Sequence, residues 1–90
     1  MKTLRFSHQF KKDFKRYRNN PAKISSLNNI LKLLKDGKTI PPEHHPHFLS
    51  GQYKGCMECH IGPDFLIIWQ DEATDIVYLV RLGSHSELFD

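Results

Sequence analysis

Cysteine and long apolar runs are scarce in this 90-residue chain, and each scarcity excludes a class of protein. The two cysteines, Cys56 and Cys59, are too few for the disulfide framework that stabilises small secreted domains. No apolar run approaches the roughly 18 residues that a membrane-spanning helix requires. Residues 1–6 lack the apolar stretch of a secretion signal. We therefore expect a single cytoplasmic domain, residues 1–90, that makes no contact with a membrane.

Acidic side chains are nearly absent from the first part of the chain, and their absence divides the charge into two zones. Residues 1–38 contain eleven lysines and arginines and only two acids, which gives a net charge of +9, whereas residues 39–90 carry a net charge of −6. Five of the six histidines lie in the second zone. Solvated lysines on a helix surface are the commoner explanation of any one basic run, but a basic half can also attract a polyanion. The separation predicts a basic binding surface and a titratable chemical centre on different elements.

The apolar pattern of the basic half predicts a strand followed by two helices. Residues 3–6 are typical of a short strand, and Ser7 is a suitable N-cap for a helix over 8–18. Asn20 is a suitable N-cap and Pro21 a favourable first residue for the next helix, which we expect to end at Gly37. The polar positions of the first helix hold the cations expected to bind a polyanion: Lys11, Lys12, Lys15 and Arg16.

The second half predicts three strands after a long loop, rich in proline and histidine, at 38–52. The strands are expected at 53–61, 65–70 and 76–82, with turns at 62–64 and 71–75. The capping-box spacing of Ser84 and Glu87 predicts a final helical turn. The order β-α-α-β-β-β indicates an α+β fold: a small antiparallel sheet, with the two helices packed on one face and the other face open.

Side-chain alternation divides the strand at 53–61 into two faces. One face presents Lys54, Cys56, Glu58 and His60, and the other presents Tyr53, Gly55, Met57 and Cys59. The first set is too polar to lie under the helices, so we expect it on the open face of the sheet. A merely solvated outer face is the alternative explanation that this strand by itself leaves open.

Further polar side chains lie at or beyond the ends of the strands and can converge on the same face: His47, Asp64, Arg81 and His85. Such a cluster suits cleavage of RNA, which supplies its own nucleophile, the 2′-hydroxyl. The enzyme then needs a general base, a general acid for the departing 5′-oxygen, and cations for the phosphate. Histidine can perform either proton transfer near neutral pH. The residues therefore favour a ribonuclease that uses neither a metal nor another cofactor.

Two other functions remain open from the residues. Cys56 and Cys59 could form a zinc site with the histidines at 44–47, but residues three apart in one strand lie on opposite faces. The same geometry, together with a reducing compartment, disfavours a disulfide between the two cysteines. The basic half could instead belong to a non-catalytic RNA- or ribosome-binding module. Three further histidines are interpreted as ordinary surface residues: His8, His44 and His45.

Three segments, taken together and in order, match a known family. They are HFLSGQYKG at 47–55, ECHIGPDF at 58–65 and RLGSHSELF at 81–89. With its lysine-rich first helix, the chain resembles the YafQ branch of the RelE-like toxins of bacterial toxin–antitoxin systems. The resemblance spans the full chain and implies a RelE-like fold. It also implies a ribosome-dependent endoribonuclease that cleaves mRNA, is neutralised by a small antitoxin, and contacts DNA indirectly through the antitoxin complex.

The resemblance also assigns site positions. The catalytic positions of the family are matched by His47, His60, Asp64 and His85. An acidic position is matched by Glu58, and a phosphate-contacting position by Arg81. The aromatic positions near the substrate are matched by Tyr53, Phe65 and Phe89. Tyr53 and Phe65 stand where the family commonly has tryptophan, a departure that keeps an aromatic ring and bears on base preference.

Our role hypothesis gives His85 the part of general acid, and either Glu58 or His60 the part of general base. Asp64 would orient a histidine or contact the substrate. The cations that stabilise the phosphate charge would be His47, Lys54 and Arg81.

Overall fold

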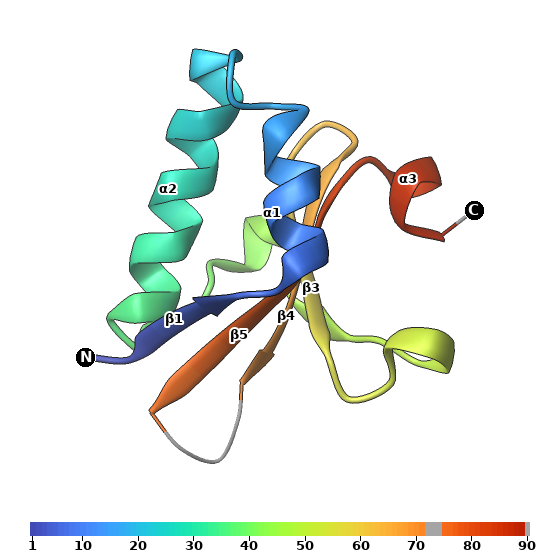
Figure 1. The fold of residues 1–90 in the computed structure, drawn as a ribbon. Coiled ribbons are helices and arrows are strands. Elements are labelled where there is room, and N and C mark those ends of the chain that lie inside the picture. Colours follow the sequence, from blue (N-terminus) through green and yellow to red (C-terminus); the bar gives the residue numbers. More distant parts are fainter. Residues whose placement is uncertain (72–74, 90) are drawn as a thin grey trace.

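The computed structural model describes residues 1–71 and 75–89 and shows an α+β fold, as predicted (Figure 1). The helices and strands follow in this order: β1 (Thr3–Phe6), α1 (His8–Lys15), α2 (Pro21–Lys35), β2 (His47–Phe48), β3 (Met57–Gly62), β4 (Phe65–Asp71), β5 (Ile76–Gly83) and α3 (His85–Phe89). Short 3-10 turns, η1 (Pro42–His44) and η2 (Gly51–Tyr53), lie in the long loop before β3. Residues 72–74 of the turn expected at 71–75, and Asp90 of the tail, lie outside the described residues. Among the described helices, none is long and apolar enough to span a membrane.

The strands of the described residues form a five-stranded sheet in the order β1-β5-β4-β3-β2. β3, β4 and β5 form the expected antiparallel meander. β1 pairs with β5 in parallel, so the sheet is mixed rather than antiparallel throughout. Parallel neighbours require a crossover connection, which here contains α1, α2 and the rest of the sheet. The short β1 segment shows no sign of this orientation in its sequence, because its partner lies near the other end of the chain.

The helices α1 and α2 lie on the same side of the sheet, as predicted (Figure 1). The core between the two layers includes Phe10, Leu27 and Ile30 from the helices, and Cys59, Ile67 and Leu79 from the strands. The predicted caps form, since Ser7 Oγ accepts a hydrogen bond from the Phe10 N–H and Asn20 caps α2 in the same way. α1 ends at Lys15 rather than at residue 18, because residues 16–19 form the turn into α2.

The strand expected at 53–61 begins at Met57, which corrects the predicted row of side chains. Tyr53 lies in η2, and Lys54 follows it in an exposed turn before the strand. Lys54 therefore does not extend the row that contains Glu58. The alternation rule failed here because it applies only where the backbone is extended, and this backbone turns.

The loop at 38–52 is more ordered than its composition indicates. Its β2 segment pairs antiparallel with β3, which places His47 directly opposite Glu58. The chain reverses between the two strands through a turn in which Gly55 has a φ of 91°. Glycine adopts this left-handed conformation without the steric cost that other residues bear. The pairing brings a loop histidine onto the sheet, which the sequence pattern did not specify.

The face of the sheet away from α1 and α2 is partly covered, whereas an open face was expected. A second buried cluster lies on it: Cys56, Leu66, Ile68 and Leu88. Leu88 belongs to α3, and Leu49, Tyr53 and Val80 pack around the cluster. The signal for this cover was present in β4, because a continuous apolar run is typical of a strand buried on both faces.

Candidate active site

The pairing registers place His47, Glu58, Ile68 and Arg81 in one row across β2, β3, β4 and β5. Residues directly opposite one another on antiparallel strands project to the same face of the sheet. With a spacing of about 4.8 Å between strands, the row extends about 14 Å. A parallel row contains His60, Leu66 and Gly83, and His85 follows Gly83 by two residues. The pairing of β2, β3, β4 and β5 therefore brings residues that are distant in the sequence onto one face.

His85 begins α3, and several polar groups hold this helix in place. The Ser84 N–H donates to Glu87 Oε1 at 2.8 Å and the Glu87 N–H donates to Ser84 Oγ at 3.2 Å, which is the predicted capping box. A Cβ at Gly83, where φ is 157°, would lie 2.7 Å from Glu87 Oε1, so glycine leaves room for the box. Asp64 Oδ1 accepts a hydrogen bond from the His85 N–H at 2.9 Å. Asp64 thus contacts the backbone of His85 and ties α3 to the β3–β4 turn.

Glu58 is buried behind His47. The Glu58 side chain is 4% exposed, and its Oε1 lies 3.3 Å from His47 Nε2. The His47 side chain is 47% exposed. His47 Nδ1 lies 2.7 Å from the His45 carbonyl oxygen, which can only accept, so Nδ1 carries a proton. Glu58 Oε2 has no hydrogen-bond partner among the described residues. An unpaired buried carboxylate oxygen is costly, and such groups are characteristic of functional sites.

His60 is exposed, and two histidines that the sequence reasoning set aside lie beside it. His44 Nδ1 contacts the His60 carbonyl oxygen at 2.7 Å. The rings of His45 and His60 meet edge to face, with centroids 5.8 Å apart. The clustering of histidines in the loop was the signal that could have identified these neighbours. His60 therefore lies at the edge of an imidazole cluster.

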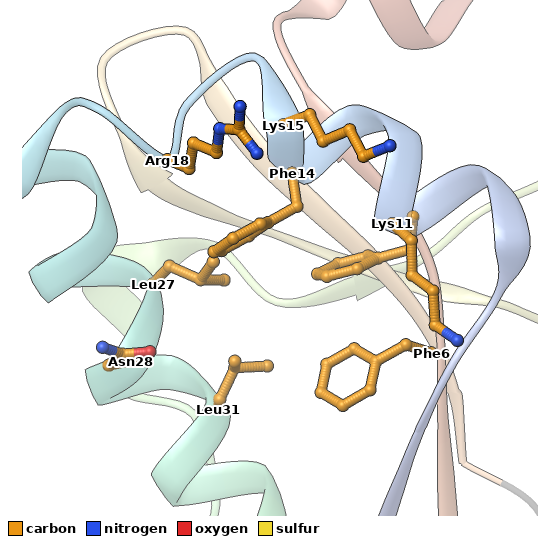
Figure 2. A pocket seen from close by; sticks show the side chains of 9 residues that line it. Phe6, Lys11, Phe14, Lys15, Arg18, Leu27, Asn28 and Leu31 are labelled. Atoms are coloured by element: carbon orange, nitrogen blue, oxygen red, sulfur yellow. The ribbon is translucent and has the colours of Figure 1, made fainter.

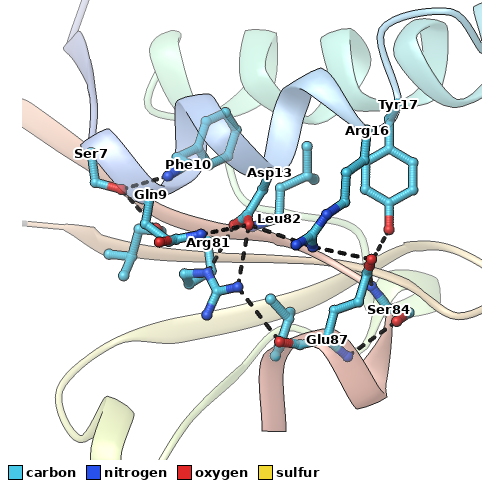
Figure 3. Close-up of polar contacts among 12 residues, drawn as sticks. Ser7, Gln9, Phe10, Asp13, Arg16, Tyr17, Arg81, Leu82, Ser84 and Glu87 are labelled. Atoms are coloured by element: carbon cyan, nitrogen blue, oxygen red, sulfur yellow. Dashed lines mark hydrogen bonds and ion pairs between the residues drawn. The ribbon is translucent and has the colours of Figure 1, made fainter. Parts of the chain in front are cut away.

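Arg81 is paired with a carboxylate that the sequence reasoning did not consider. Arg81 Nε and Nη2 donate to Asp13 Oδ2 and Oδ1 at 2.8 Å and 3.2 Å (Figure 3). The hydrogen bond with Asp13 raises the pKa of Arg81 further above its ordinary value. Asp13 is a rare acid on the basic first helix, three residues after the buried Phe10, and this position was the available signal.

The aromatic residues divide between the two faces. The Tyr53 hydroxyl donates to the Leu88 carbonyl oxygen at 2.9 Å, and the Tyr53 and Phe89 rings meet with centroids 5.6 Å apart. These two rings belong to the face that carries His85. Phe65 does not, because it is 2% exposed and packs against Tyr17 in the core under the helices. The expected substrate contact by Phe65 is therefore corrected to a core position.

The basic residues of α1 also divide. Lys11 and Lys15 line a groove of about 470 Å³ between β1, α1 and α2, in the helix layer (Figure 2). Arg16 instead contacts Glu87 Oε2 of α3 at 3.1 Å. Lys12 is exposed on the same helix. Lys11 and Lys15 therefore lie apart from the face of the sheet that carries His47 and His60.

Cys56 and Cys59 belong to different buried clusters and lie on opposite faces of the sheet, as predicted. Burial, with a contribution from Glu58, raises the pKa of the Cys59 thiol to about 12. Within residues 1–71 and 75–89, no three His, Cys, Asp or Glu side chains gather in a group that could hold a metal ion. The geometry does not support the zinc site considered from the sequence.

A small mixed sheet that carries histidines, with two helices on its other face, is the architecture of a class of bacterial toxins. Residues 2–90 match the family described as the bacterial toxin of type II toxin–antitoxin systems, YafQ. The chain belongs to this YafQ toxin family. The family inferred from the three sequence motifs is therefore confirmed.

Individual relatives agree with this assignment over nearly the whole chain. The mRNA interferase toxin YafQ of Escherichia coli K12 is 28% identical over 88 residues, which cover 96% of this chain and 94% of that protein. A metal-bound toxin from Helicobacter pylori is 37% identical, with a TM-score of 0.86 over 99% of this chain and 100% of that one. The match to a chain of the E. coli DinJ–YafQ complex has a TM-score of 0.86 at 25% identity. It covers 100% of this chain and 100% of that chain. The expected enzyme class, an endoribonuclease, is the class of the relatives named mRNA interferases.

Proposed function

We propose that this protein is an endoribonuclease that cleaves mRNA on the ribosome, in the cytoplasm, without a metal, and that a cognate antitoxin neutralises it. The observation that carries the proposal is that His47, Glu58, His60 and Arg81 share one face of the sheet, and that His85 begins α3 two residues beyond Gly83, which lies in the row of His60. These residues supply proton donors, proton acceptors and a cation, which are the groups that phosphodiester cleavage requires.

In the reaction, a base removes the proton of the 2′-hydroxyl and the 2′-oxygen attacks the phosphorus. The bond from phosphorus to the 5′-oxygen breaks, and an acid protonates that oxygen. The products are a 2′,3′-cyclic phosphate and a free 5′-hydroxyl. His85 fits the acid, because it lies exposed at the start of a helix that Asp64 and the capping box hold in place.

His60 fits the general base better than Glu58 does. The ring of His60 is exposed and forms no hydrogen bond within the described residues, so its nitrogens are available to a 2′-hydroxyl. The Glu58 carboxylate lies behind the His47 ring. An imidazolium at His47, next to the Glu58 carboxylate, would stabilise the phosphate charge. Glu58 then acts on the substrate through His47.

The test compares wild type with His85→Ala and His60→Ala on mRNA bound to translating ribosomes. Each substitution should lower the cleavage rate by about 10²–10⁴-fold, the usual contribution of a general acid or base. His60→Ala should also remove the low-pH limb of the pH–rate profile, since that limb reports protonation of the base. His8→Ala, in an exposed histidine of α1, is the matched control and should cleave like wild type.

Cleavage that persists in His85→Ala would contradict its role as acid. If wild type binds ribosomes but cuts no RNA and does not stop growth, the non-catalytic binding module replaces the nuclease. Activity that disappears with a chelator and returns with a metal would contradict the metal-independent reaction. The same assay with free RNA shows whether the ribosome is required.

The groove between α1 and α2 fits the antitoxin as its occupant. Phe6, Phe14 and Leu31 give it an apolar floor, and Lys11, Lys15 and Arg18 stand along it (Figure 2). Phe6 is 40% exposed, so part of its ring is open at this groove. An acidic, amphipathic segment would cover the apolar floor and pair with the cations. The E. coli relative was solved in complex with DinJ, which agrees with a partner of this kind.

The groove assignment predicts that Lys11→Glu with Lys15→Glu weakens binding of the protein encoded by the adjoining short reading frame. The loss should be about tenfold or more at low salt and smaller at high salt, because exposed charges are screened. Lys54→Glu, an exposed site near the opposite face, is the matched control for this binding. Equal affinity of the double variant and the control, measured by calorimetry, would contradict the assignment.

A further inference from the structure

Asp13 is a fully buried carboxylate with every side of it occupied. It is 0% exposed and accepts hydrogen bonds from Arg81 Nε and Nη2, from the Leu82 N–H at 3.0 Å and from Gln9 Nε2 at 3.1 Å. β1 ends opposite Leu79, so the Leu82 N–H lies on a stretch of the β5 edge beyond that pairing. Asp13 satisfies this N–H and holds the guanidinium in a bidentate pair.

Arg81 also contacts α3, both directly and through Tyr53. Its Nη1 lies 3.2 Å from the Tyr53 hydroxyl, which in turn donates to the Leu88 carbonyl oxygen at 2.9 Å. Arg81 Nη2 also reaches the Glu87 carbonyl oxygen at 3.5 Å. These carbonyls belong to the helix that begins with His85, and Figure 3 shows Arg81 between α1 and α3.

A second contact from the same side of α1 reinforces the first. Glu87 accepts hydrogen bonds from the Tyr17 hydroxyl and from Arg16 Nη1. Residues 13, 16 and 17 are spaced by three and four positions, so they project from one side of the chain around the end of α1. α3 contains only five residues and is too short to form a stable helix without such contacts.

We propose that Asp13 is a positioning residue for RNA cleavage: through the Arg81 guanidinium it fixes α3, and with it the His85 ring, relative to His60 on β3. The proposal rests on the nuclease function proposed above. Without Asp13, the guanidinium keeps its charge but loses the partner that orients its planar fork. RNA would still be attracted, whereas the acid would no longer be held at the scissile bond.

The decisive variant is Asp13→Asn, which keeps the size of the side chain and removes its charge. The expected result is a fall in kcat of about 100-fold, the effect of a displacement of about 1 Å at a reacting group, with KM unchanged or lower. A general loss of folded protein would only lower the active fraction and leave the shape of the pH–rate profile unchanged. A displaced general acid should also change that shape. Because Asp13 acts through Arg81, the double variant with Arg81→Ala should be no slower than Arg81→Ala.

The matched control is Asp71→Asn, the same chemical change in an exposed carboxylate that pairs with Lys2 at 2.9 Å. It should cleave like wild type. In NMR spectra, Asp13→Asn should shift the signals of His85 and Phe89 and speed exchange of the Arg81 Nε–H, and Asp71→Asn should do neither. A wild-type kcat in Asp13→Asn, or additive effects with Arg81→Ala, would overturn the proposal.

If Asp13→Asn does not fold, Tyr53→Phe tests the contact between Arg81 and α3 instead. This substitution deletes the hydroxyl that lies between Arg81 and the Leu88 carbonyl oxygen and keeps the ring. A lower kcat with unchanged KM supports the proposal, and a wild-type kcat overturns it. If wild type cleaves no RNA, the proposed function has failed. The NMR comparison of Asp13→Asn with wild type then still tests whether Asp13 fixes the position of α3.

Discussion

Asp13 and Glu58 are both buried carboxylates, and the difference in their surroundings separates their roles. Asp13 has hydrogen-bond donors on both oxygens, including a bidentate guanidinium. Glu58 faces one histidine ring and leaves Oε2 without a partner among the described residues. A satisfied buried ion pair specifies geometry, while an unsatisfied oxygen retains capacity to interact with a substrate or a proton. The two acids thus suit positioning and chemistry respectively.

At the scale of one residue, Tyr17 should titrate far above an ordinary tyrosine. Burial, then the hydrogen bond to Glu87, raises its pKa from 10.0 to about 12. Since the folded pKa exceeds the unfolded one, the stability from neutral Tyr17 is present below pH 10 and is lost as pH rises through 12. Absorbance at 295 nm should show a late ionisation step in wild type that Tyr17→Phe lacks. Ionisation of all tyrosines together near pH 10 would contradict this expectation.

At the scale of the element, α3 is held by side chains from other segments. Its capping box, Asp64, Arg81 and Tyr53 supply polar contacts, and Leu88 packs into the second buried cluster. Because these contacts come from several segments, the helix carrying His85 responds to changes far along the chain. The short helix α3 is therefore stabilised by tertiary contacts rather than by its own hydrogen bonds.

Glu87→Gln should loosen α3 in a manner that depends on pH. The hydrogen bond from the Ser84 N–H, followed by that from Tyr17, holds the pKa of Glu87 below its ordinary value of 4.5. Its contribution to stability is thus present above pH 4.5 and is lost as pH falls through the folded pKa. We expect about two- to fivefold faster exchange of the Leu88 amide in the variant near pH 7, since an exposed ion pair contributes below about 1 kcal/mol.

The ratio of exchange rates between Glu87→Gln and wild type should return to one in acid. Glu43→Gln, in an exposed carboxylate of η1, serves as the control and should not change the Leu88 amide at any pH. A ratio that stays constant from pH 7 to pH 3 would show that the charge of Glu87 does not hold the helix.

At the scale of the whole molecule, one sheet separates two buried clusters of unequal size. The larger cluster joins the sheet to α1 and α2, and the smaller one lies under α3 and the loop before β3. β4 contributes to both, with Ile67 on one side and Ile68 on the other. Such a shared strand should couple the two clusters into one cooperative unit.

We therefore predict one unfolding transition for the chain. Trp69 is 3% exposed and belongs to the larger cluster, so its fluorescence and the far-UV circular dichroism should change together in urea. Ile67→Ala should lower the free energy of unfolding by about 2–5 kcal/mol, because it leaves a cavity in the core. Lys12→Ala, an exposed position, should change it by less than about 0.5 kcal/mol. Two separate transitions would contradict the single-domain expectation.

Much of the fold and part of the site could be predicted, because the signals were local. Both helix caps, the capping box of α3 and the opposite faces of Cys56 and Cys59 depend on residues a few positions apart. Strand alternation indicated that His60 shares a face with Glu58, and the resemblance assigned catalytic positions to His47, His60 and His85, but neither identified their contacts. The place of Phe65 was missed because an aromatic match in sequence does not reveal which face its side chain occupies.

The sequence by itself determined the order of the helices and of β1, β3, β4 and β5, and the types of residue available for chemistry, since periodicity and capping act within a few residues of one another. The tertiary structure decided the rest. The parallel pairing of β1, the pairing of β2 that brings His47 to Glu58, and the pair between Asp13 and Arg81 join segments distant in the chain. Such contacts form only when the chain packs, because no local pattern specifies which of many compatible partners a strand or a charge will meet.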